Sequence, residues 1–375
     1  MGYARRLVAP VGRPLRRAAI GLRTREWAPY SRLFLVYDRE GWVLEHEARQ
    51  LARVASSLGV QLGPSEWAKG VSEQSVFHLS QFTALLHDPP RQGNRIGLSY
   101  FHGRPGTPGF PEFDACFDAL RRRRDEIERV QVTNGEMAEL VLETGLAPEK
   151  VHRIPIGIDV EAFPLRTEGA RAAARRELVL PETAFVVGSF QKDGVGWGDG
   201  LEPKLIKGPD ILLAVVGRLR ERIPALVVLV TGPARGFVRA GLDGLGVPYR
   251  HLLLPDVEAV ARAYEAIDVC LVTSRDEGGP RAVLEAMATG APLVTTRVGQ
   301  AIDLVRDREN GWLVDVDDVD GLVTWVAHIA EAPAGELESV VRAGRTTAEA
   351  SSYDALRPRW RELLQGFVEL PGARE

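Results

Sequence analysis

The sequence predicts an α/β protein of two domains, each built on a parallel β-sheet. Three observations carry this prediction. Short apolar runs rich in β-branched residues recur along the chain, as in strands that are buried on both faces of a sheet. Segments whose apolar residues repeat at helical spacing separate these runs. At 375 residues, the chain is long enough for two hydrophobic cores rather than one.

The expected elements follow from this patterning, taken in chain order. The apolar runs predict strands at residues 33–37, 76–79, 96–101, 130–133, 185–190, 226–231, 267–272, 292–296 and 312–314. Helical spacing predicts helices at residues 44–58, 112–129, 211–219, 256–266, 319–330, 337–350 and 353–368. Asn134 is expected to cap a helix that follows it. Residues 63–95 are weakly patterned and predict no topology beyond their one strand.

Composition limits the classes of function. The net charge of -4 argues against general nucleic-acid binding. No apolar run approaches the 18 residues that would indicate a membrane span. Cys116 and Cys270 are the two cysteines, and Cys270 falls inside a predicted core strand, so no disulfide framework is expected. The N-terminus shows no secretory signal, and the expected location is the cytoplasm.

A basic segment opens the chain. Its first 30 residues hold seven arginines and one acidic residue, Glu26, which gives a charge of +6 (seven minus one). Interleaved apolar residues make the segment amphipathic, which is typical of peripheral binding to an anionic membrane, here the inner face, through residues 1–27. A solvated basic tail and an organelle transit peptide are the alternatives. The arginines are Arg5, Arg6, Arg13, Arg16, Arg17, Arg23 and Arg25.

The most informative stretch is 274–285, between a predicted strand and a predicted helix. Glu277 lies in the loop at the carboxyl end of the strand, the edge at which open parallel sheets bind ligands. The backbone amides of Gly278, Gly279 and Arg281, at the start of a helix with Pro280 in its first position, suit an anion such as a diphosphate. Glu285 follows within the helix. The alternative is that both glutamates are ordinary surface charges near a helix start.

This stretch, followed by Met287-Ala-Thr-Gly290 and the strand at 292–296, resembles the E-x7-E signature of retaining glycosyltransferases of family 4. The junction Ile154-Pro-Ile-Gly-Ile-Asp159 also resembles that family. The resemblance implies the GT-B fold, in which two Rossmann-like domains face a central cleft and a C-terminal helix crosses back to the first domain. It also implies that Glu277 faces the donor sugar and that Glu285 holds the nucleotide ribose.

From this resemblance, we expect the chain to divide into four segments. They are a basic extension at 1–30, an N-terminal acceptor domain at 31–160, a C-terminal donor domain at 161–350 and a returning helix at 351–375. The family's first loop, at Asp38-Arg-Glu-Gly-Trp42, is usually glycine-rich and lies near donor and acceptor. Here it holds only Gly41, which leaves the acceptor side open.

The resemblance also implies ligands for the donor diphosphate. Lys207 matches the family's phosphate-binding lysine, and an ammonium at a strand-to-helix turn stabilises a phosphate leaving group. Ser189 occupies the place of the family's arginine, so the match is incomplete. Lys192 or Lys204, in or beside a long loop at 191–203, is a candidate replacement for that arginine, and the alternative for each is a surface lysine. Glu277 and Lys207 are therefore candidate catalytic residues.

Two further turns are expected at the ligand-binding edges of the sheets. His102 ends a predicted strand and resembles the family's cleft histidine, which contacts the transferred sugar or the acceptor. His102 is therefore the third candidate catalytic residue, and a structural turn histidine is the alternative. Gly232 and Arg235 follow the strand at 226–231. Arg235 is expected either to touch the donor or to be exposed.

Two other motifs are interpreted as unrelated to ligands. The run 194–200 looks like a dinucleotide fingerprint, but Asp199 stands where the third glycine belongs, so a flexible loop is expected. The Asp-x-Asp pairs at 315–317 and 318–320 resemble a metal motif of another glycosyltransferase fold. Their position before a helix is explained by capping, and no metal is expected.

The predicted function is transfer of a sugar from a nucleotide-diphosphate sugar to a glycan, lipid-linked or small-molecule acceptor, with retention of configuration. The expected partners are that donor and that acceptor, with no cofactor beyond the co-substrate and no nucleic acid. A non-catalytic sugar-nucleotide-binding protein is one alternative, because Ser189 replaces a phosphate ligand. A GT-B epimerase is another, but it requires an acid pair in the cleft that the sequence does not identify.

Overall fold

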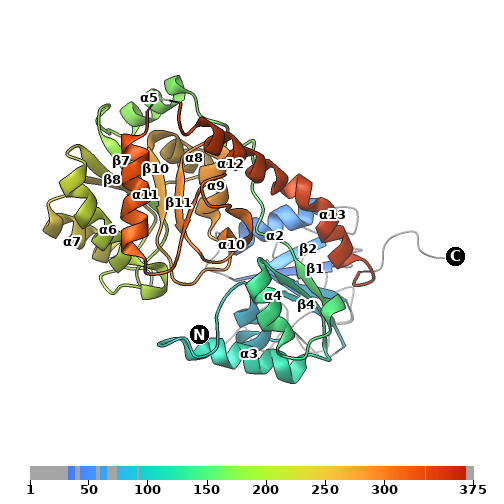
Figure 1. The fold of residues 1–375 in the computed structure, drawn as a ribbon. Helices are drawn as coiled ribbons and strands as arrows, with labels where there is room; N and C mark the ends of the chain where they lie inside the picture. The colour runs from blue at the N-terminus through green and yellow to red at the C-terminus, as the bar shows by residue number, and fades with distance from the viewer. Residues whose placement is uncertain are drawn as a thin grey trace, which may run out of the picture. The chain divides into compact units, whose positions relative to one another are not determined.

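A computed structural model of the chain describes residues 33–38, 43–55, 60–65, 74–90, 93–333 and 335–368. These residues form two compact units (Figure 1). The first takes its described residues from Met1–Pro155 and Tyr353–Glu375, and the second is Ile156–Ser352. The predicted basic extension and most of the predicted loop 38–42 lie outside the described residues. Within those ranges, none of the helices has the length and apolar character needed to cross a lipid bilayer.

The first unit is built on a parallel sheet with the strand order β2-β1-β3-β4-β5-β6. Its strands are β1 (Leu33–Tyr37), β2 (Val60–Pro64), β3 (Ser75–His78), β4 (Arg95–Ser99), β5 (Ile127–Val132) and β6 (Val151–Arg153). Its helical elements are α2 (Val43–Val54), the π-helix η3 (Thr83–His87), α3 (Pro111–Arg123), α4 (Gly135–Leu142), the 3₁₀ helix η4 (Pro148–Lys150) and α13 (Tyr353–Leu364).

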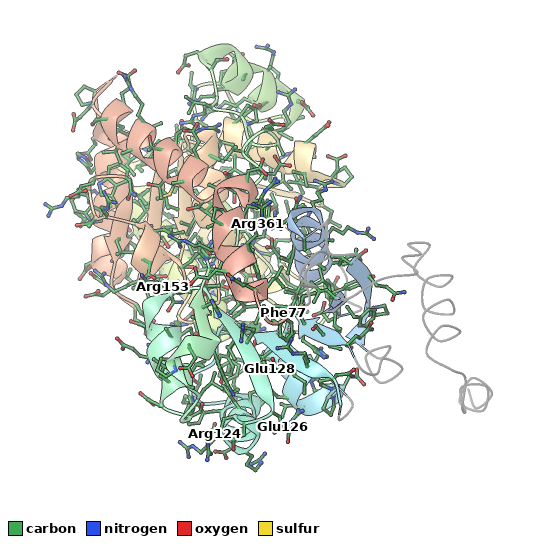
Figure 2. All side chains as sticks on the ribbon, turned by 90° about the vertical axis from the view of Figure 1, so that its right-hand side faces the viewer. Phe77, Arg124, Glu126, Glu128, Arg153 and Arg361 are labelled. Atoms are coloured by element: carbon green, nitrogen blue, oxygen red, sulfur yellow. The ribbon has the colours of Figure 1, made fainter. Side chains whose placement is uncertain are left out.

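The last helix, α13, completes the core of this first unit. Phe77 of β3, labelled in Figure 2, packs edge-on against Trp360 and Phe367, with ring centroids 6.0 and 6.4 Å apart. Arg129 of β5 donates to the carbonyl of Leu363 at 2.9 Å. The apolar stripe of this C-terminal segment therefore covers one face of the first sheet, and the returning helix of the predicted fold class is present.

The second unit repeats the plan with the strand order β12-β11-β10-β7-β8-β9, again all parallel. Its strands are β7 (Phe185–Phe190), β8 (Leu226–Thr231), β9 (Tyr249–Leu252), β10 (Val269–Val272), β11 (Leu293–Thr296) and β12 (Trp312–Val314). Its helices are α5 (Glu168–Glu177), η5 (Leu205–Lys207), α6 (Pro209–Arg222), α7 (Gly236–Leu245), α8 (Val257–Ala266), α9 (Arg281–Thr289), α10 (Ala301–Leu304), α11 (Val319–Glu331) and α12 (Glu338–Ala350).

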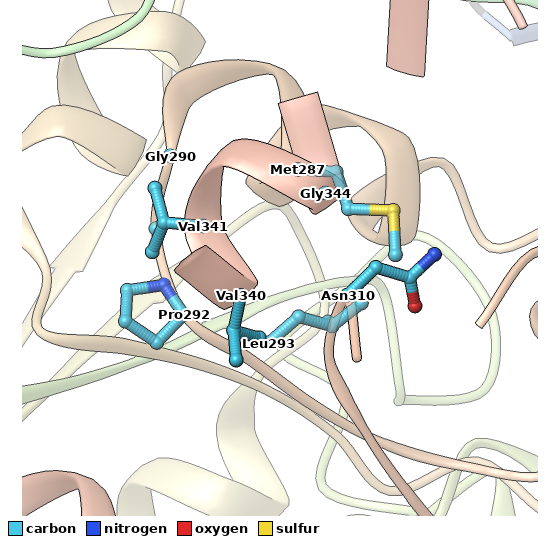
Figure 3. A pocket seen from close by; sticks show the side chains of 9 residues that line it. Met287, Gly290, Pro292, Leu293, Asn310, Val340, Val341 and Gly344 are labelled. Atoms are coloured by element: carbon cyan, nitrogen blue, oxygen red, sulfur yellow. The ribbon is translucent and has the colours of Figure 1, made fainter. Parts of the chain in front are cut away.

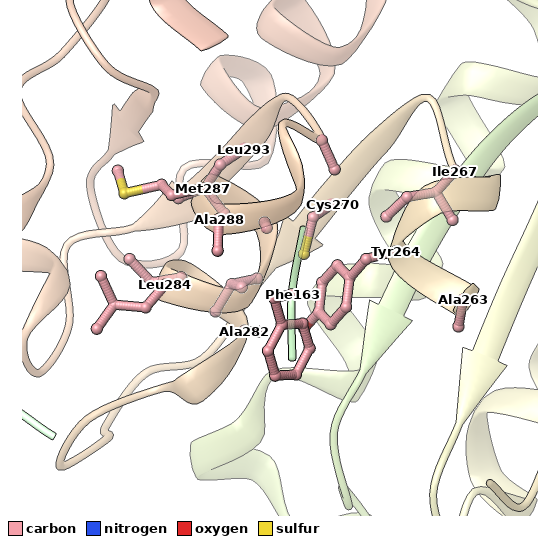
Figure 4. Close-up of a cluster of buried hydrophobic side chains, with 14 of the residues drawn as sticks. Phe163, Ala263, Tyr264, Ile267, Cys270, Ala282, Leu284, Met287, Ala288 and Leu293 are labelled. Atoms are coloured by element: carbon pink, nitrogen blue, oxygen red, sulfur yellow. The ribbon is translucent and has the colours of Figure 1, made fainter. Parts of the chain in front are cut away.

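Both faces of this second sheet are buried, which is why its strands are apolar throughout. One face packs on a cluster that includes Tyr264, Cys270 and Met287, beneath α8 and α9 (Figure 4). The other packs on α6, α7 and α11 through residues such as Leu212, Val238 and Leu322. Two covered faces leave the edges of the sheet, where the loops emerge, as the places for a polar site.

The predicted helix 112–129 is wrong in extent, and three strands were missed. The predicted helix 112–129 ends at Arg123, because Ile127–Val132 pairs with β4 as strand β5. Tertiary pairing here overrides the local helical spacing. Strands β2, β6 and β9 lie in stretches where the sequence predicted none. The predicted cap is confirmed, since the Asn134 side chain accepts a hydrogen bond from the Met137 amide at 2.9 Å.

His78, at the carboxyl end of β3, gives the first unit a pH-dependent stability. Burial lowers the pKa of His78 from 6.5 to about 3. The unfolded chain therefore binds a proton below pH 6.5 that the folded chain does not, so stability falls as the pH drops from 6.5 towards 3, by at most about 1.4 kcal/mol per unit. We expect His78→Asn to flatten this slope in urea titrations at several pH values. The exposed His87 is the control: a His87→Asn variant with an equally flattened slope would contradict the assignment.

Candidate functional site

Two loops of the second sheet meet where its strand order reverses. β7 lies between β8 and β10. Strands β8 and β9 extend the sheet on one side of β7, and β10, β11 and β12 extend it on the other side. Because the strands are parallel, the loops after β7 and β10 leave the sheet at the same edge. Open parallel sheets bind ligands at such a point. The loop after β7 leads to Lys207, and the loop after β10 carries Glu277.

Lys207 and Glu277, predicted from separate motifs, contact each other. Lys207 Nζ and Glu277 Oε2 form an ion pair, with side chains 18% and 13% exposed. The Ser274 hydroxyl donates to Glu277 Oε1 at 3.0 Å, and Gln191 Nε2 donates to the Lys207 carbonyl at 2.8 Å. Both side chains keep some access to solvent. A charged ligand can therefore displace one partner of the ion pair, and the displaced charge is not left buried without a partner.

Gly208 is required for the turn that presents Lys207. Its φ of +62° lies in the left-handed region, which glycine adopts without a steric penalty. A Cβ at this position would lie 1.9 Å from the carbonyl oxygen of Thr273. The Thr273 hydroxyl also donates to the Gly208 carbonyl at 2.8 Å. The turn is therefore packed directly on the end of β10, which keeps Lys207 beside Glu277.

The helix that follows Glu277 starts without a side-chain cap. α9 begins at Arg281, so Pro280 is the N-cap residue rather than the first helical residue as predicted, and it makes no capping hydrogen bond through its side chain. The positive end of the helix dipole therefore faces the loop of Gly278 and Gly279. A Cβ on Gly299 would lie 2.6 Å from the Glu277 carbonyl oxygen, so the loop after β11 packs against this loop.

Glu285 lies in α9 with both carboxylate oxygens engaged. The Tyr264 hydroxyl donates to Oε2 at 2.9 Å, and Arg281 Nε donates to Oε1 at 3.2 Å. Burial, with a contribution from the neighbouring Glu285 charge, raises the pKa of Tyr264, so this phenol stays a donor. The side chain of Glu285 is thus fixed in orientation, in the middle of the helix that follows the Glu277 loop.

Ser189 and Arg235 lie together, but not as predicted. Arg235 is 0% exposed, so the expectation of an exposed side chain is wrong. Its guanidinium donates to the carbonyls of Ser189, Gln191 and Thr231 at 2.8–2.9 Å and to the Ser189 hydroxyl at 3.1 Å. Its Nε lies 3.0 Å from Asp193 Oδ1. Arg235 therefore holds the ends of β7 and β8 and the loop after β7 in place rather than presenting its charge to a ligand.

The long loop 191–203, which contains the run 194–200 that was expected to be flexible, is held by backbone hydrogen bonds. Val195 N donates to the Glu202 carbonyl at 2.9 Å, and the loop carbonyls of Asp199 and Gly200 accept from the first amides of α7. Within it, Lys192 Nζ lies 4.1 Å from the centroid of the Trp197 ring. Beyond it, the Lys204 amide donates to the Asp193 carbonyl at 2.8 Å.

Gly232 follows β8 directly, at the same edge of the sheet as the long loop. Its φ of +88° is left-handed, and its carbonyl is 2.8 Å from Nε2 of His251, on the adjacent strand β9. Its predicted donor contact stays a prediction.

His102 belongs to the first unit, at the end of β4, and is held by residues that the sequence did not identify. Gln81 is 1% exposed; its Nε2 donates to the His102 carbonyl at 2.7 Å, and its Oε1 accepts from the Phe101 amide at 3.3 Å. The His102 ring packs between Phe82 and Phe113, with centroids 5.8 and 5.5 Å away. The π-helix η3, which starts two residues after Gln81, is the kind of irregularity that marks functional sites, but no sequence pattern announces it.

Other motifs do not add a ligand site. The Asp318 side chain accepts from the Gly321 amide at 2.9 Å and caps α11, which confirms the capping interpretation. Among the described residues, no group of three or more His, Cys, Asp and Glu side chains is placed to hold a metal ion. The pocket in Figure 3 lies between α9 and α12, at the end of α9 away from Glu277, and is lined mainly by apolar groups such as Met287, Leu293 and Val341.

The sequence of the second unit matches a known domain. Residues 200–332 match the model of the family described as Glycosyl transferases group 1. The matched range lies inside the second unit, Ile156–Ser352. The matched range contains the Lys207–Glu277 ion pair and Glu285.

Curated relatives that match 60–64% of the chain carry a narrower name. The chain is 32% identical over 264 residues to the D-inositol 3-phosphate glycosyltransferase of Saccharomonospora viridis, which covers 64% of this chain and 57% of that protein. It is 31% identical over 236 residues to the D-inositol 3-phosphate glycosyltransferase of Segniliparus rotundus. This match covers 60% of this chain and 49% of the relative. The chain thus spans about half the length of the curated relatives that it matches.

Solved structures establish the fold. The Anabaena protein HepE, solved in complex with UDP and glucose, superposes with a TM-score of 0.70 at 13% identity, covering 90% of this chain and 100% of HepE. Sucrose-phosphate synthase from Thermosynechococcus elongatus gives a TM-score of 0.69 at 17% identity, covering 90% of this chain and 98% of that one. The two parallel six-stranded sheets with their helices therefore confirm the predicted GT-B fold class.

Proposed function

We propose that this protein is a glycosyltransferase that moves a sugar from a nucleotide-diphosphate sugar to a hydroxyl of its acceptor. One observation carries the proposal: Lys207 and Glu277 form an ion pair at the switch point of the second sheet, beside the start of α9, which no side chain caps. A cation, a helix N-terminus and a carboxylate at one sheet edge match the diphosphate and the hydroxyls of one ligand. The group 1 domain match supports it.

The donor contacts follow from this geometry. In the proposal, the diphosphate replaces Glu277 as the partner of Lys207 and accepts hydrogen bonds from the backbone amides of Gly278, Gly279 and Arg281. Lys192, stacked on Trp197, is a second proposed phosphate contact, in place of the family's arginine. The freed Glu277 carboxylate then accepts hydrogen bonds from sugar hydroxyls. Glu285, held by Tyr264 and Arg281, is the proposed ribose ligand.

The reaction needs charge stabilisation on the leaving group. The bond between the anomeric carbon and the diphosphate oxygen breaks, and its electron pair leaves with the diphosphate. Positive charge that develops on the sugar ring is offset by Glu277, and negative charge on the diphosphate by Lys207 and the start of α9. The acceptor oxygen bonds to the anomeric carbon and gives its proton to the departing phosphate. Retention of configuration is part of the proposal and rests on the family resemblance; NMR of the product's anomeric proton tests it.

The acceptor is proposed to meet His102 of the first unit. The curated relatives act, by name, on D-inositol 3-phosphate, so this compound belongs in an acceptor panel together with lipid-linked and glycan acceptors. We also propose that residues 1–27, which lie outside the described residues, bind anionic membranes peripherally. Liposome sedimentation tests this, and equal binding after deletion of residues 1–27 would contradict it.

The decisive experiment is release of nucleoside diphosphate from UDP-, GDP- and ADP-sugars, with and without acceptors. We expect one donor class to be consumed, and Lys207→Met to lower that rate at least about 100-fold, because one preorganised charge on the leaving group is lost. Lys150→Met, a lysine of the first unit that bonds the Arg124 carbonyl, is the control. Tight binding of a sugar nucleotide with no turnover in any acceptor mixture would favour the binding-only alternative.

We expect turnover without a divalent metal. Lys207 and the start of α9 supply the positive charge that a metal ion would otherwise bring to the diphosphate. Dialysis against EDTA should therefore leave the rate of donor consumption within about twofold of the untreated rate. A loss that added Mg²⁺ or Mn²⁺ restores would contradict this part of the proposal.

Gln81 is proposed as a positioning residue for His102. Gln81→Leu removes two hydrogen bonds to the 101–102 backbone, so kcat/KM is expected to fall about 10-fold. A merely structural effect is separated by a double-mutant cycle: in a His102→Ala background the same substitution should cost little more. Equal, additive losses in both backgrounds would show that Gln81 does not act through His102.

A further inference from the structure

Gln300 lies at the donor edge of the second sheet and has no role in the function proposed so far. It follows Gly299 in the loop between β11 and α10 and is the N-cap residue of α10. Gly299 packs against the carbonyl oxygens of Glu277 and Gly278, at 2.6 and 2.7 Å from an added Cβ. Gln300 is 0% exposed, which is unusual for a residue type that is mostly found at surfaces.

Only one end of the Gln300 amide is satisfied by the protein. Its Oε1 accepts from the Ile156 backbone amide at 2.9 Å, which fixes which end is oxygen. Its Nε2 is buried and has no hydrogen-bond partner among the residues that the structure describes. A buried donor left without an acceptor is destabilising, so an unpaired one is a candidate for a hydrogen bond to a water molecule or a ligand.

The unsatisfied amide lies against the loop that is proposed to hold the donor. A Cβ added to Gly279 would lie 2.9 Å from Gln300 Oε1 and 3.1 Å from its Cδ, so the carboxamide covers the α-carbon of Gly279. Gly279 lies between Glu277, which pairs with Lys207, and the uncapped start of α9. An acceptor oxygen brought by a ligand to this loop would be the nearest external partner for Nε2.

We propose that Gln300 is a further ligand of the sugar nucleotide, with Nε2 donating a hydrogen bond to one of its oxygens, either a sugar hydroxyl or a phosphate oxygen. This rests on the proposed function, since it assigns one more contact of the same site. The Ile156–Gln300 hydrogen bond orients the amide so that its donor end is presented before the ligand binds, and Gly279 leaves the space that the amide occupies. Gln300 thereby adds a neutral side-chain donor to a site whose other proposed hydrogen-bond donors are Lys207, Lys192 and backbone amides.

The test is titration calorimetry of Gln300→Met and Gln300→Glu with UDP-glucose and UDP, or with the corresponding pair if the donor panel selects another base. Methionine is neutral and close in length but lacks both hydrogen bonds, whereas glutamate keeps an acceptor for Ile156 and lacks the donor. We expect both variants to bind the sugar nucleotide at least about 10-fold more weakly. If Gln300→Met binds both UDP-glucose and UDP more weakly, the oxygen that accepts from Nε2 belongs to the diphosphate. If it binds only UDP-glucose more weakly, that oxygen belongs to the sugar.

Asn310→Leu is the matched control. Asn310 is a buried amide of the same unit whose groups bond Leu304, Arg306 and Thr347, so its loss should lower thermal stability without changing the dissociation constant. Unchanged affinity in Gln300→Met would overturn the proposal. So would weak binding by Gln300→Met with full affinity in Gln300→Glu, because the effect would then come from the bond to Ile156. If the unsubstituted protein binds no sugar nucleotide, the proposed function itself fails, which is a different result.

Discussion

Replacing Arg235 with methionine is expected to lower the free energy of unfolding by about 3–5 kcal/mol, the largest stability effect that we predict for one substitution. Arg235 and Asp193 form a buried ion pair with side chains 0% and 1% exposed. Burial already raises the pKa of Asp193 against the opposing effect of the guanidinium. Without Arg235, a carboxylate stays buried beside three carbonyl oxygens that have lost their donor. Urea unfolding at neutral pH measures the loss.

Two comparisons make this prediction specific. Adding Asp193→Leu to Arg235→Met removes the stranded charge and should recover part of the lost stability. Arg218→Met is the control, because Arg218 pairs with Asp320 at the surface, with side chains 52% and 82% exposed, where ion pairs contribute about 0–1 kcal/mol. A loss for Arg235→Met no larger than that of Arg218→Met would show that the buried pair does not hold the loop after β7.

Replacing Glu277 with glutamine is expected to lower turnover of the sugar nucleotide by roughly 100–1000-fold, the range observed when one preorganised electrostatic contact to a transition state is removed. The amide is isosteric and keeps a contact with Ser274, which isolates the charge. The dissociation constant of the nucleoside diphosphate should change much less, because the carboxylate faces the sugar. Steady-state kinetics with the preferred donor measure kcat, and calorimetry measures binding.

Glu265→Gln is the matched control for this substitution. Glu265 is a buried glutamate of the same unit that pairs with Arg262 in α8, away from the loops of β7 and β10. Its replacement should lower stability and leave kcat within about twofold. If Glu277→Gln retains near-normal kcat, Glu277 has no electrostatic role and the assignment of the site is wrong.

The features predicted from the sequence are those with a local signal. Continuous apolar runs predicted β7, β8 and β11. A strand that is buried on both faces is apolar along its whole length, so the run itself is the signal. Lys207 and Glu277 were found through motifs whose strand-to-helix context is itself local. Their contact follows from the reversal of strand order at β7, which brings the two loops to one edge.

The features missed depend on partners far away in the sequence. Arg235 was expected at the surface or on the donor, yet it is buried, because Asp193, 42 positions earlier, supplies its counter-charge. Gln81 reaches the backbone at His102, and Gln300 reaches that of Ile156, through contacts that no pattern near either glutamine reveals. Strand β2 is short, contains Gly63 and ends in Pro64, so its apolar signal is weak although it pairs with β1 along its whole length.

The most direct test of the central claim is calorimetric titration of the unsubstituted protein and of Lys207→Met with UDP, GDP and ADP. If the loops after β7 and β10 form a nucleotide-diphosphate site, one nucleotide should bind the unsubstituted protein, and Lys207→Met should weaken it at least about 10-fold through loss of a charge-assisted contact. Absence of binding by all three nucleotides, or equal affinity in the two proteins, would contradict the account.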